Sequence, residues 1–212
     1  MSGTGNALAA HKVVVEGLAL PARLSGHPAL DFCNTRAGWD GRGGRDYLED
    51  YDHLAVFASY VGALEEDRVA ALRRESRRRE RAAALALGRA RRLRASLYDV
   101  LRHGTSAPSW DAVTREVAAA AGARRLCRAG DEARWEIAPP SSLAAPVLAL
   151  AWSAGELLTS PEVGSVRACP GVGCGWLFVD RRGRRRWCTM STCGNRAKAR
   201  RFAARHGERD GP

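Results

Sequence analysis

Two short stretches decide the fold of the C-terminal region: Cys169-Pro-Gly-Val-Gly-Cys174 and Cys188-Thr-Met-Ser-Thr-Cys193. Both have the spacing Cys-x4-Cys, and thirteen residues separate the two pairs. Two glycines and a proline in the first pair favour a tight turn, which brings both sulfurs to one point. Because four thiolates are soft ligands that form a closed tetrahedral site, the pattern predicts one structural Zn²⁺ held by Cys169, Cys174, Cys188 and Cys193.

Other roles for these cysteines are two disulfides, four free thiols, or an iron–sulfur cluster held by the same thiolates. The expected cellular compartment of the chain favours metal binding over disulfides. The N-terminal segment has no charged leader followed by an uninterrupted apolar run, since Glu16 breaks Val13–Ala22. The apolar stretch Leu143–Leu158 is too short for a bilayer and carries Glu156. We therefore expect a cytoplasmic protein with no membrane partner, in which paired cysteines bind metal.

The residues around the cysteines predict the order knuckle, hairpin, second knuckle, helix, which is a treble-clef-like layout. Trp176–Val179 has strand composition, Arg181–Arg186 is too charged to be buried, and Trp187 is expected to begin the return strand. Gly194–Arg205 has a helical pattern. So small a module needs its metal to fold, and structural zinc contributes about 10–16 kcal/mol.

Upstream, 45% hydrophobic content in 212 residues allows one further domain with its own core. The expected fold class is α+β, with a mainly helical N-terminal domain (13–162), a small antiparallel sheet, and the zinc module (166–207). Residues 1–12 show no periodicity and 163–165 form a linker. The expected elements are a strand within Arg23–Phe32, helices at Asp52–Gly62, Glu65–His103 (as two) and from Ser109 through Val117, a hairpin around Gly130-Asp131, and a buried helix at Leu143–Thr159.

The net charge of +11 is concentrated at one end of the chain. Residues 163–212 contain 12 Arg/Lys and 3 Asp/Glu, a net of +9, which predicts a polyanionic partner. On the last helix Lys198, Arg201 and Arg205 share one face, and Ala199 and Phe202 are expected to pack inward. The candidate nucleic-acid-binding residues are Arg184, Arg185, Arg186, Asn195, Arg196, Lys198, Arg200, Arg201 and Arg205. Some of these arginines could instead compensate the thiolates.

A second polar cluster follows the first expected strand. Asp31, Asn34 and Thr35 stand close together, and Trp39 and Asp40 follow in a Gly-rich loop. One interpretation is a small-molecule pocket formed by His27, Asp31, Asn34, Thr35 and Arg36. The other is that Asp31 and Asn34 satisfy backbone groups in a turn.

The segment Cys174-Gly-Trp-Leu-Phe-Val-Asp180, with Arg185 through Arg200 and the motif Cys193-Gly-Asn-Arg196, resembles the CGNR zinc-finger family. Pro28-Ala-Leu-Asp-Phe-Cys-Asn-Thr35 is similar to the opening of the ABATE domain, its usual N-terminal companion. The resemblance implies that the four cysteines are zinc ligands. It also implies a stress-linked transcriptional regulator of bacterial type.

The leading hypothesis is a regulator that binds double-stranded DNA through the zinc module and senses a small-molecule effector or partner through the N-terminal domain. An enzyme with its active site around Asp31 and Asn34, beside a purely structural zinc module, is the first alternative. The sequence contains no Ser/His/Asp set and no phosphate-binding Gly loop, so we assign no catalytic residues. RNA binding through the same basic surface is the second alternative.

Overall fold

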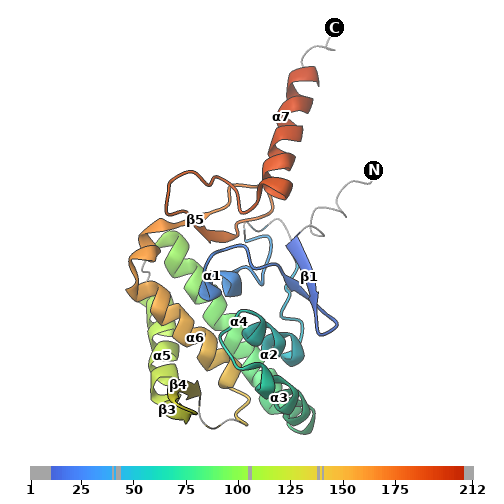
Figure 1. The fold of residues 1–212 in the computed structure, drawn as a ribbon. Helices are drawn as coiled ribbons and strands as arrows, with labels where there is room; N and C mark the ends of the chain where they lie inside the picture. The colour runs from blue at the N-terminus through green and yellow to red at the C-terminus, as the bar shows by residue number, and fades with distance from the viewer. Residues whose placement is uncertain are drawn as a thin grey trace.

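The computed structural model describes residues 11–39, 41, 44–104, 107–137, 139 and 141–207. Predictions for residues 1–10 and for Asp40 lie outside this part of the chain. The elements are β1 (Lys12–Val15), β2 (Leu18–Pro21), α1 (Pro28–Cys33), α2 (Tyr51–Tyr60), α3 (Glu66–Arg78), α4 (Glu80–His103), α5 (Ala107–Ala123), β3 (Arg124–Ala129), β4 (Glu132–Ile137), α6 (Ala145–Thr159), β5 (Val166–Ala168), β6 (Leu177–Val179) and α7 (Asn195–Gly207). Figure 1 shows most of the helices packed into one body, from which α7 projects.

The N-terminal region differs from the sequence-based expectation. Residues 12–21 form an antiparallel hairpin, so Lys12 is part of a strand and not of an irregular tail. The strand expected within Arg23–Phe32 is wrong, because Pro28–Cys33 is helical. Pro28 occupies the first turn, where its missing N–H costs nothing, and the His27 ring accepts a hydrogen bond from the Ala29 N–H as N-cap.

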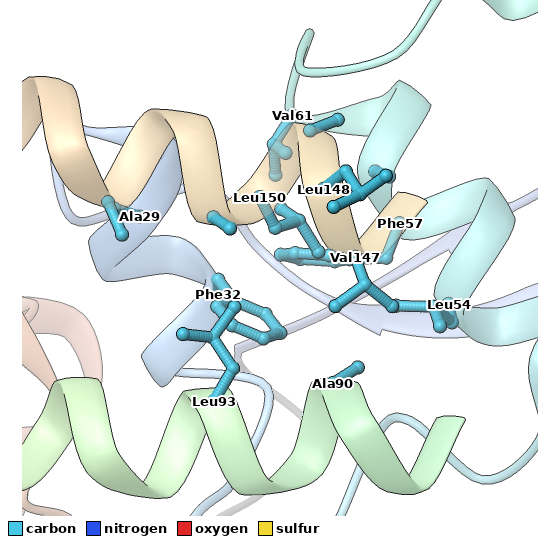
Figure 2. Packing of buried hydrophobic residues seen from close by; sticks show 14 of the residues in the cluster. Ala29, Phe32, Leu54, Phe57, Val61, Ala90, Leu93, Val147, Leu148 and Leu150 are labelled. Carbon is cyan, nitrogen blue, oxygen red and sulfur yellow. The ribbon is translucent and has the colours of Figure 1, made fainter. Parts of the chain in front are cut away.

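The helices are built as the apolar periodicity predicts. The helix expected at Asp52–Gly62 is α2, the two expected over Glu65–His103 are α3 and α4, and the helix expected near Trp110 is α5, which begins before Ser109. The helix expected at Leu143–Thr159 is α6, and it is buried on nearly every side. Figure 2 shows its residues Val147 and Leu150 beside side chains of α2 and α4. Burial of this kind contributes about 25 cal/mol per Å² of apolar surface, and it fixes the helices around α6.

The hairpin predicted around Gly130-Asp131 is confirmed as β3 and β4. Arg124 pairs with Ile137 and Ala129 pairs with Glu132 in antiparallel register. Gly130 has φ 66°, a left-handed conformation that suits a two-residue turn. The hairpin packs against α6 through β4, which places Arg124 and Trp135 beside the helix bundle.

The C-terminal region contains the expected two knuckles, hairpin and final helix. Its strands pair differently from the expectation. A 3₁₀ helix (Pro161–Ser165) replaces the expected linker. β6 pairs with β5, so the hairpin encloses the first cysteine pair instead of following it. The return strand expected at Trp187 is wrong, because residues 180–189 form an irregular loop and no strand. A π-helical turn (Met190–Gly194) leads directly into α7.

Direct hydrogen bonds join the zinc module to the helical body. The Asn34 side chain donates to the Leu177 carbonyl at 2.9 Å and accepts from the Leu177 N–H at 2.8 Å. The Trp176 indole donates to the Arg36 carbonyl at 3.0 Å, and the Tyr98 hydroxyl donates to the Gly175 carbonyl at 2.8 Å. Because these groups are largely buried, the two parts form one continuous packed structure. Among the described helices, none combines the length and the apolar character needed to cross a lipid bilayer.

Candidate metal centre and nucleic-acid interface

The four predicted cysteines converge at one buried point. Their Sγ atoms all lie within 4.8 Å of one another, and no other group of metal-binding side chains of this kind occurs among the described residues. Cys188 Sγ is 3.7 Å from Cys174 Sγ and 3.5 Å from Cys193 Sγ. A tetrahedral ion with Zn–S bonds of about 2.3 Å requires sulfur–sulfur edges of about 3.8 Å. The cluster therefore fits one structural zinc ion per chain.

The first knuckle depends on the absence of a side chain at Gly171. A Cβ at this position would lie 2.9 Å from Cys193 Sγ and 3.4 Å from Cys169 Sγ. The Gly171 carbonyl also accepts a hydrogen bond from the Cys174 N–H at 3.0 Å, which closes the turn. Glycine thus allows the backbone to pass close to the sulfurs while it turns both cysteines of the pair inward.

The second pair is positioned by the turn before α7. Thr189 caps the π-helical turn by accepting a hydrogen bond from the Ser191 N–H, and Cys193 lies within this turn. Cys188 and Cys193 are almost completely buried, like the first pair. Because α7 follows the turn immediately, the metal site fixes the starting direction of that helix.

The thiol groups influence one another strongly. Hydrogen bonding from Cys174 lowers the pKa of Cys169 to about 7, and hydrogen bonding from Cys169 also lowers the pKa of Cys193. The same network raises the pKa of both Cys174 and Cys188, with the contact to Cys169 as the largest cause. Four thiolates this close repel one another, so full ionisation requires a cation among them. A zinc ion held here would supply that charge, and with four protein ligands its role is structural.

Residues far away in sequence complete the surroundings of the cluster. Tyr47 is buried in the same apolar group as the cysteines, Trp176 and Phe178. His11 is only 4% exposed, and its ring lies against that of Trp176 with centroids 4.7 Å apart. His11 Nε2 is 3.9 Å from Cys188 Sγ. This proximity could not be predicted from the sequence, because His11 has no ligand spacing and stands 177 positions from Cys188.

Seven of the nine predicted nucleic-acid-binding residues are exposed, among them Asn195 at the start of α7. Lys198, Arg200, Arg201 and Arg205 occupy the part of α7 that stands clear of the body (Figure 1), and Arg184 and Arg186 lie in the preceding basic loop. The expectation that Ala199 and Phe202 pack inward is wrong: both are exposed, Phe202 by 65%. This exposure agrees with the projection of α7 from the described helical body in Figure 1. Basic residues therefore occur around this helix and not on one face alone.

Three of the predicted residues make hydrogen bonds within the protein: the half-buried Arg185 and Arg196, and the exposed Asn195. Arg185 donates to the carbonyls of Leu24 and Cys188, and its guanidinium lies 4.4 Å from the Phe178 ring centroid. Arg196 donates to Cys193 Sγ at 3.1 Å, which offsets thiolate charge. Asn195 donates to the Ser191 carbonyl at 3.2 Å. These contacts agree with the interpretation that part of the basic set serves the metal site.

A groove runs between the first knuckle and α7. Its volume is about 220 Å³, and Arg186, Arg196, Arg200 and Arg201 line it together with Trp187. The Arg186 guanidinium lies 5.2 Å from a ring centroid of Trp187, so charge and an aromatic surface occur together. In such a groove, arginines can contact phosphates and an aromatic ring can stack on a base, so its chemistry suits a nucleic acid.

The residues of the candidate ligand pocket near Asp31 make hydrogen bonds within the protein. Asp31 accepts from the N–H groups of Leu24 and Ser25, and burial raises its pKa. Thr35 donates to the Phe32 carbonyl and accepts from Arg94. Asn34 is bound to Leu177, and the Arg36 guanidinium lies 4.8 Å from the Trp39 ring centroid. Burial lowers the pKa of His27, whose ring serves as the N-cap of α1. These contacts agree with the backbone-satisfying interpretation of the cluster.

Two family models match consecutive parts of the chain. Residues 26–161 match the ABATE family model, described as a putative stress-induced transcription regulator. Residues 165–206 match the CGNR zinc-finger model. A search of curated proteins found no significant match. The four clustered cysteines all lie within the matched zinc-finger segment.

Proposed function

Because the chain belongs to the ABATE family and carries a C-terminal CGNR zinc finger, we propose that it is a transcription regulator that binds double-stranded DNA through its zinc module. We take residues 13–162 as the unit that senses an effector or partner, and residues 166–207 as the unit that contacts DNA. The observation that carries the proposal is the projection of α7, with four exposed basic side chains, directly from the metal site.

The shape of α7 supports contact with duplex DNA. A helix of 13 residues is about 20 Å long, and the major groove of B-DNA, about 12 Å wide, accepts one helix. Lys198, Arg200, Arg201 and Arg205 are exposed on different sides of this helix, so some can reach phosphates on both walls of a groove. The zinc site holds the first turn of α7, which gives the helix a fixed orientation for binding.

The basic loop and the arginine-lined groove extend the same surface. Arg184 and Arg186 are exposed and supply further positive charge beside the knuckle. Arg185 and Arg196 are left out of the proposed contacts, because both make close contacts near the metal site. Asn195 lies at the start of α7 and can reach a base edge only by giving up its bond to Ser191.

The hydrogen bonds between the two units support a role for the N-terminal domain in regulation. Asn34 on the C-terminal side of α1 is bonded to both backbone groups of Leu177, and α1 packs on α4 and α6. A ligand that shifts α6 relative to α1 therefore acts on a group in direct contact with the zinc module. Such a displacement would change the presentation of α7 to DNA.

The test is the affinity of the zinc-loaded chain for a mixed-sequence DNA duplex, measured by fluorescence anisotropy at low salt. The variant K198A/R200A/R201A/R205A is expected to lose at least tenfold in affinity, since each phosphate contact contributes electrostatically. The matched control is R74A/R78A/R81A/R92A, which removes the same charge from exposed positions on α3 and α4.

A control variant that weakens binding as much as the α7 variant would contradict the proposal, because it would show that only net charge matters. Competition at fixed salt with a structured RNA hairpin separates the two nucleic acids. Duplex DNA is expected to compete better than the hairpin, and the reverse order would favour RNA as the partner.

A further inference from the structure

A cavity of about 340 Å³ lies on the N-terminal domain, and Pro28 at the start of α1 is one of its lining residues. Its walls come from α6, the β3–β4 hairpin and the segment before α3, and they include Arg124, Trp135, Trp152, Ser153, Glu65 and Glu156. This volume is at the small end of the range of ligand pockets in proteins, and it suits a molecule of one or two rings. The sequence did not indicate this site, because its residues come from four separated parts of the chain: Pro28, the segment 62–65, the β3–β4 hairpin and α6.

Two buried polar atoms at this cavity have no hydrogen-bond partner among the described residues. Ser153 is 4% exposed and its Oγ is unpaired, and the Nε of Arg124 is buried and unpaired as well. A buried unpaired donor costs about 1–3 kcal/mol, so such groups are uncommon unless something binds them. The Arg124 Nε–H can only donate, and the Ser153 hydroxyl can donate as well as accept, so an acceptor would satisfy both.

Three charged side chains line the cavity: Arg124, Glu65 and Glu156. The Arg124 guanidinium lies 4.2 Å from the ring centroid of Trp152 and 5.6 Å from that of Trp135, so its positive charge lies beside both rings. Burial lowers the pKa of Arg124 and outweighs the opposite effect of the Glu156 and Glu65 charges. Glu65 is paired with Arg68, and Glu156 is exposed and accepts a hydrogen bond from the Trp152 indole.

The aromatic residues supply an apolar surface for a flat molecule. Trp135 is 53% exposed although it lines the cavity, which is unusual for so large an apolar side chain. Trp152, Ile137 and Ala149 extend the apolar wall. A planar ring that covers Trp135 would remove this surface from water and would bring a substituent toward Arg124 and Ser153.

We propose that this cavity binds a small aromatic carboxylate, with its ring against Trp135 and its carboxylate accepting hydrogen bonds from Arg124 Nε and Ser153 Oγ. The inference deepens the proposed sensing function, because α6 supplies Ser153 and also packs on α1. It concerns binding alone and does not require that the chain bind DNA.

Isothermal titration of the zinc-loaded full chain tests the proposal with benzoate and indole-3-carboxylate, against their amides and against benzamidine. At least one carboxylate is expected to bind roughly tenfold or more tightly than its amide, as charge-assisted hydrogen bonds require. Equal binding of acid and amide, preference for benzamidine, or no binding of either carboxylate at millimolar concentration would overturn the proposal. Because the titration contains no DNA, these outcomes are independent of the DNA-binding test.

Two variants locate the binding site. Ser153→Ala is expected to weaken carboxylate binding several-fold without lowering the melting temperature of the ligand-free protein, since it removes an unpaired buried hydroxyl. Arg124→Gln is expected to abolish the preference for the acid over the amide. Arg125→Gln is the matched control, because neighbouring strand residues point to opposite faces and Arg125 is exposed. If Arg125→Gln weakens binding as much as Arg124→Gln, or Ser153→Ala leaves binding unchanged, the assignment to this cavity is wrong.

Discussion

Gly171 is the residue whose replacement tests the geometry of the metal site most locally. In Gly171→Ala, the new Cβ would lie 2.9 Å from Cys193 Sγ, so the knuckle or the sulfur must move. We expect zinc affinity to fall by roughly tenfold or more, as for other changes beside metal ligands. Competition with a chelator of known affinity measures this change.

Gly164→Ala is the control for that substitution. A Cβ at Gly164 meets no atom within 4 Å, and Gly164 has no left-handed backbone conformation. Its zinc affinity is expected to match that of the unmodified chain. Equal affinities for Gly171→Ala and Gly164→Ala would show that the first knuckle is not packed around the sulfurs as described.

Asn34 offers a second prediction at the scale of single residues. Replacing Asn34 by Ala leaves the N–H and the carbonyl of buried Leu177 without their partners. We expect a loss of about 2–4 kcal/mol in the free energy of unfolding, since each unpaired buried group costs about 1–3 kcal/mol. Chemical denaturation of the zinc-loaded chain measures it, with the exposed Asn195→Ala as control. A loss below that of the control would exclude Asn34 as a main link between the two units.

At the scale of single residues, the sequence predicted the four metal-binding cysteines well and the residues around them poorly. The spacing of the four cysteines predicts metal binding, because four thiolates brought together by two tight turns leave few alternatives to a metal. The neighbours of the cluster, His11 and Tyr47, come from distant parts of the chain and follow no local pattern. The polar role of Asn34 was open in the sequence, because its partner stands 143 positions away.

The contact between α5 and α6 gives a prediction at the scale of elements. A Cβ added at Gly155 on α6 would lie 2.8 Å from a methyl carbon of Val117 on α5. In a helix, alanine is more favourable than glycine by about 1 kcal/mol, so the clash opposes an intrinsic gain. We expect Gly155→Ala to be neutral or destabilising alone and to stabilise the Val117→Ala variant.

A double-mutant cycle on the free energy of unfolding measures this coupling. The expected interaction term is on the order of 1 kcal/mol, in the range found for residues in contact. The pair Gly122→Ala and Val117→Ala is the control, because a Cβ at Gly122 meets no atom within 4 Å. Additive effects at Gly155 and Val117 would contradict the close packing of the two helices.

Periodicity predicted the long helices and failed for short elements. The helices α2, α3, α4 and α6 contain enough turns for apolar residues to recur on one side. The helix α1 has only six residues, and the local pattern of Arg23–Phe32 did not separate a strand from a capped helical turn. In the zinc module, the pairing of β5 with β6 depends on how the knuckle folds back, which composition does not encode.

Removal of the metal gives a prediction for the whole molecule. Purified, reduced chain is expected to contain one zinc per molecule, and chelation is expected to unfold the module because structural zinc contributes about 10–16 kcal/mol. The helical body is also expected to become less stable, since Asn34, Tyr98 and Arg36 lose their partners in the module. Thermal unfolding followed by circular dichroism, before and after chelation, measures both effects.

Re-addition of zinc is the control for chelation and should restore both transitions. If the helical body melts at the same temperature with and without zinc, the contacts between the two units do not contribute to its stability. If the reduced chain contains no stoichiometric zinc, the four cysteines have another role.

At the scale of the whole molecule, the charge distribution was the most informative property of the sequence. The excess of positive charge at the C-terminal end predicted a basic surface. The structure shows which of these basic side chains are exposed and which contact the metal site. The cavity at Arg124 and Ser153 could not be predicted, because it forms where the β3–β4 hairpin, α6, the start of α1 and the segment before α3 meet.

The most direct test of the account is the salt dependence of DNA affinity for the zinc-loaded chain, the α7 variant K198A/R200A/R201A/R205A and the matched control R74A/R78A/R81A/R92A. A plot of log affinity against log salt changes in slope by about 0.9 for each phosphate contact. We predict that the α7 variant loses about two to four units of slope relative to the unmodified chain, while the control keeps the original slope. An unchanged slope for the α7 variant, with its zinc retained, would contradict the claim that the metal site holds this helix for contact with DNA.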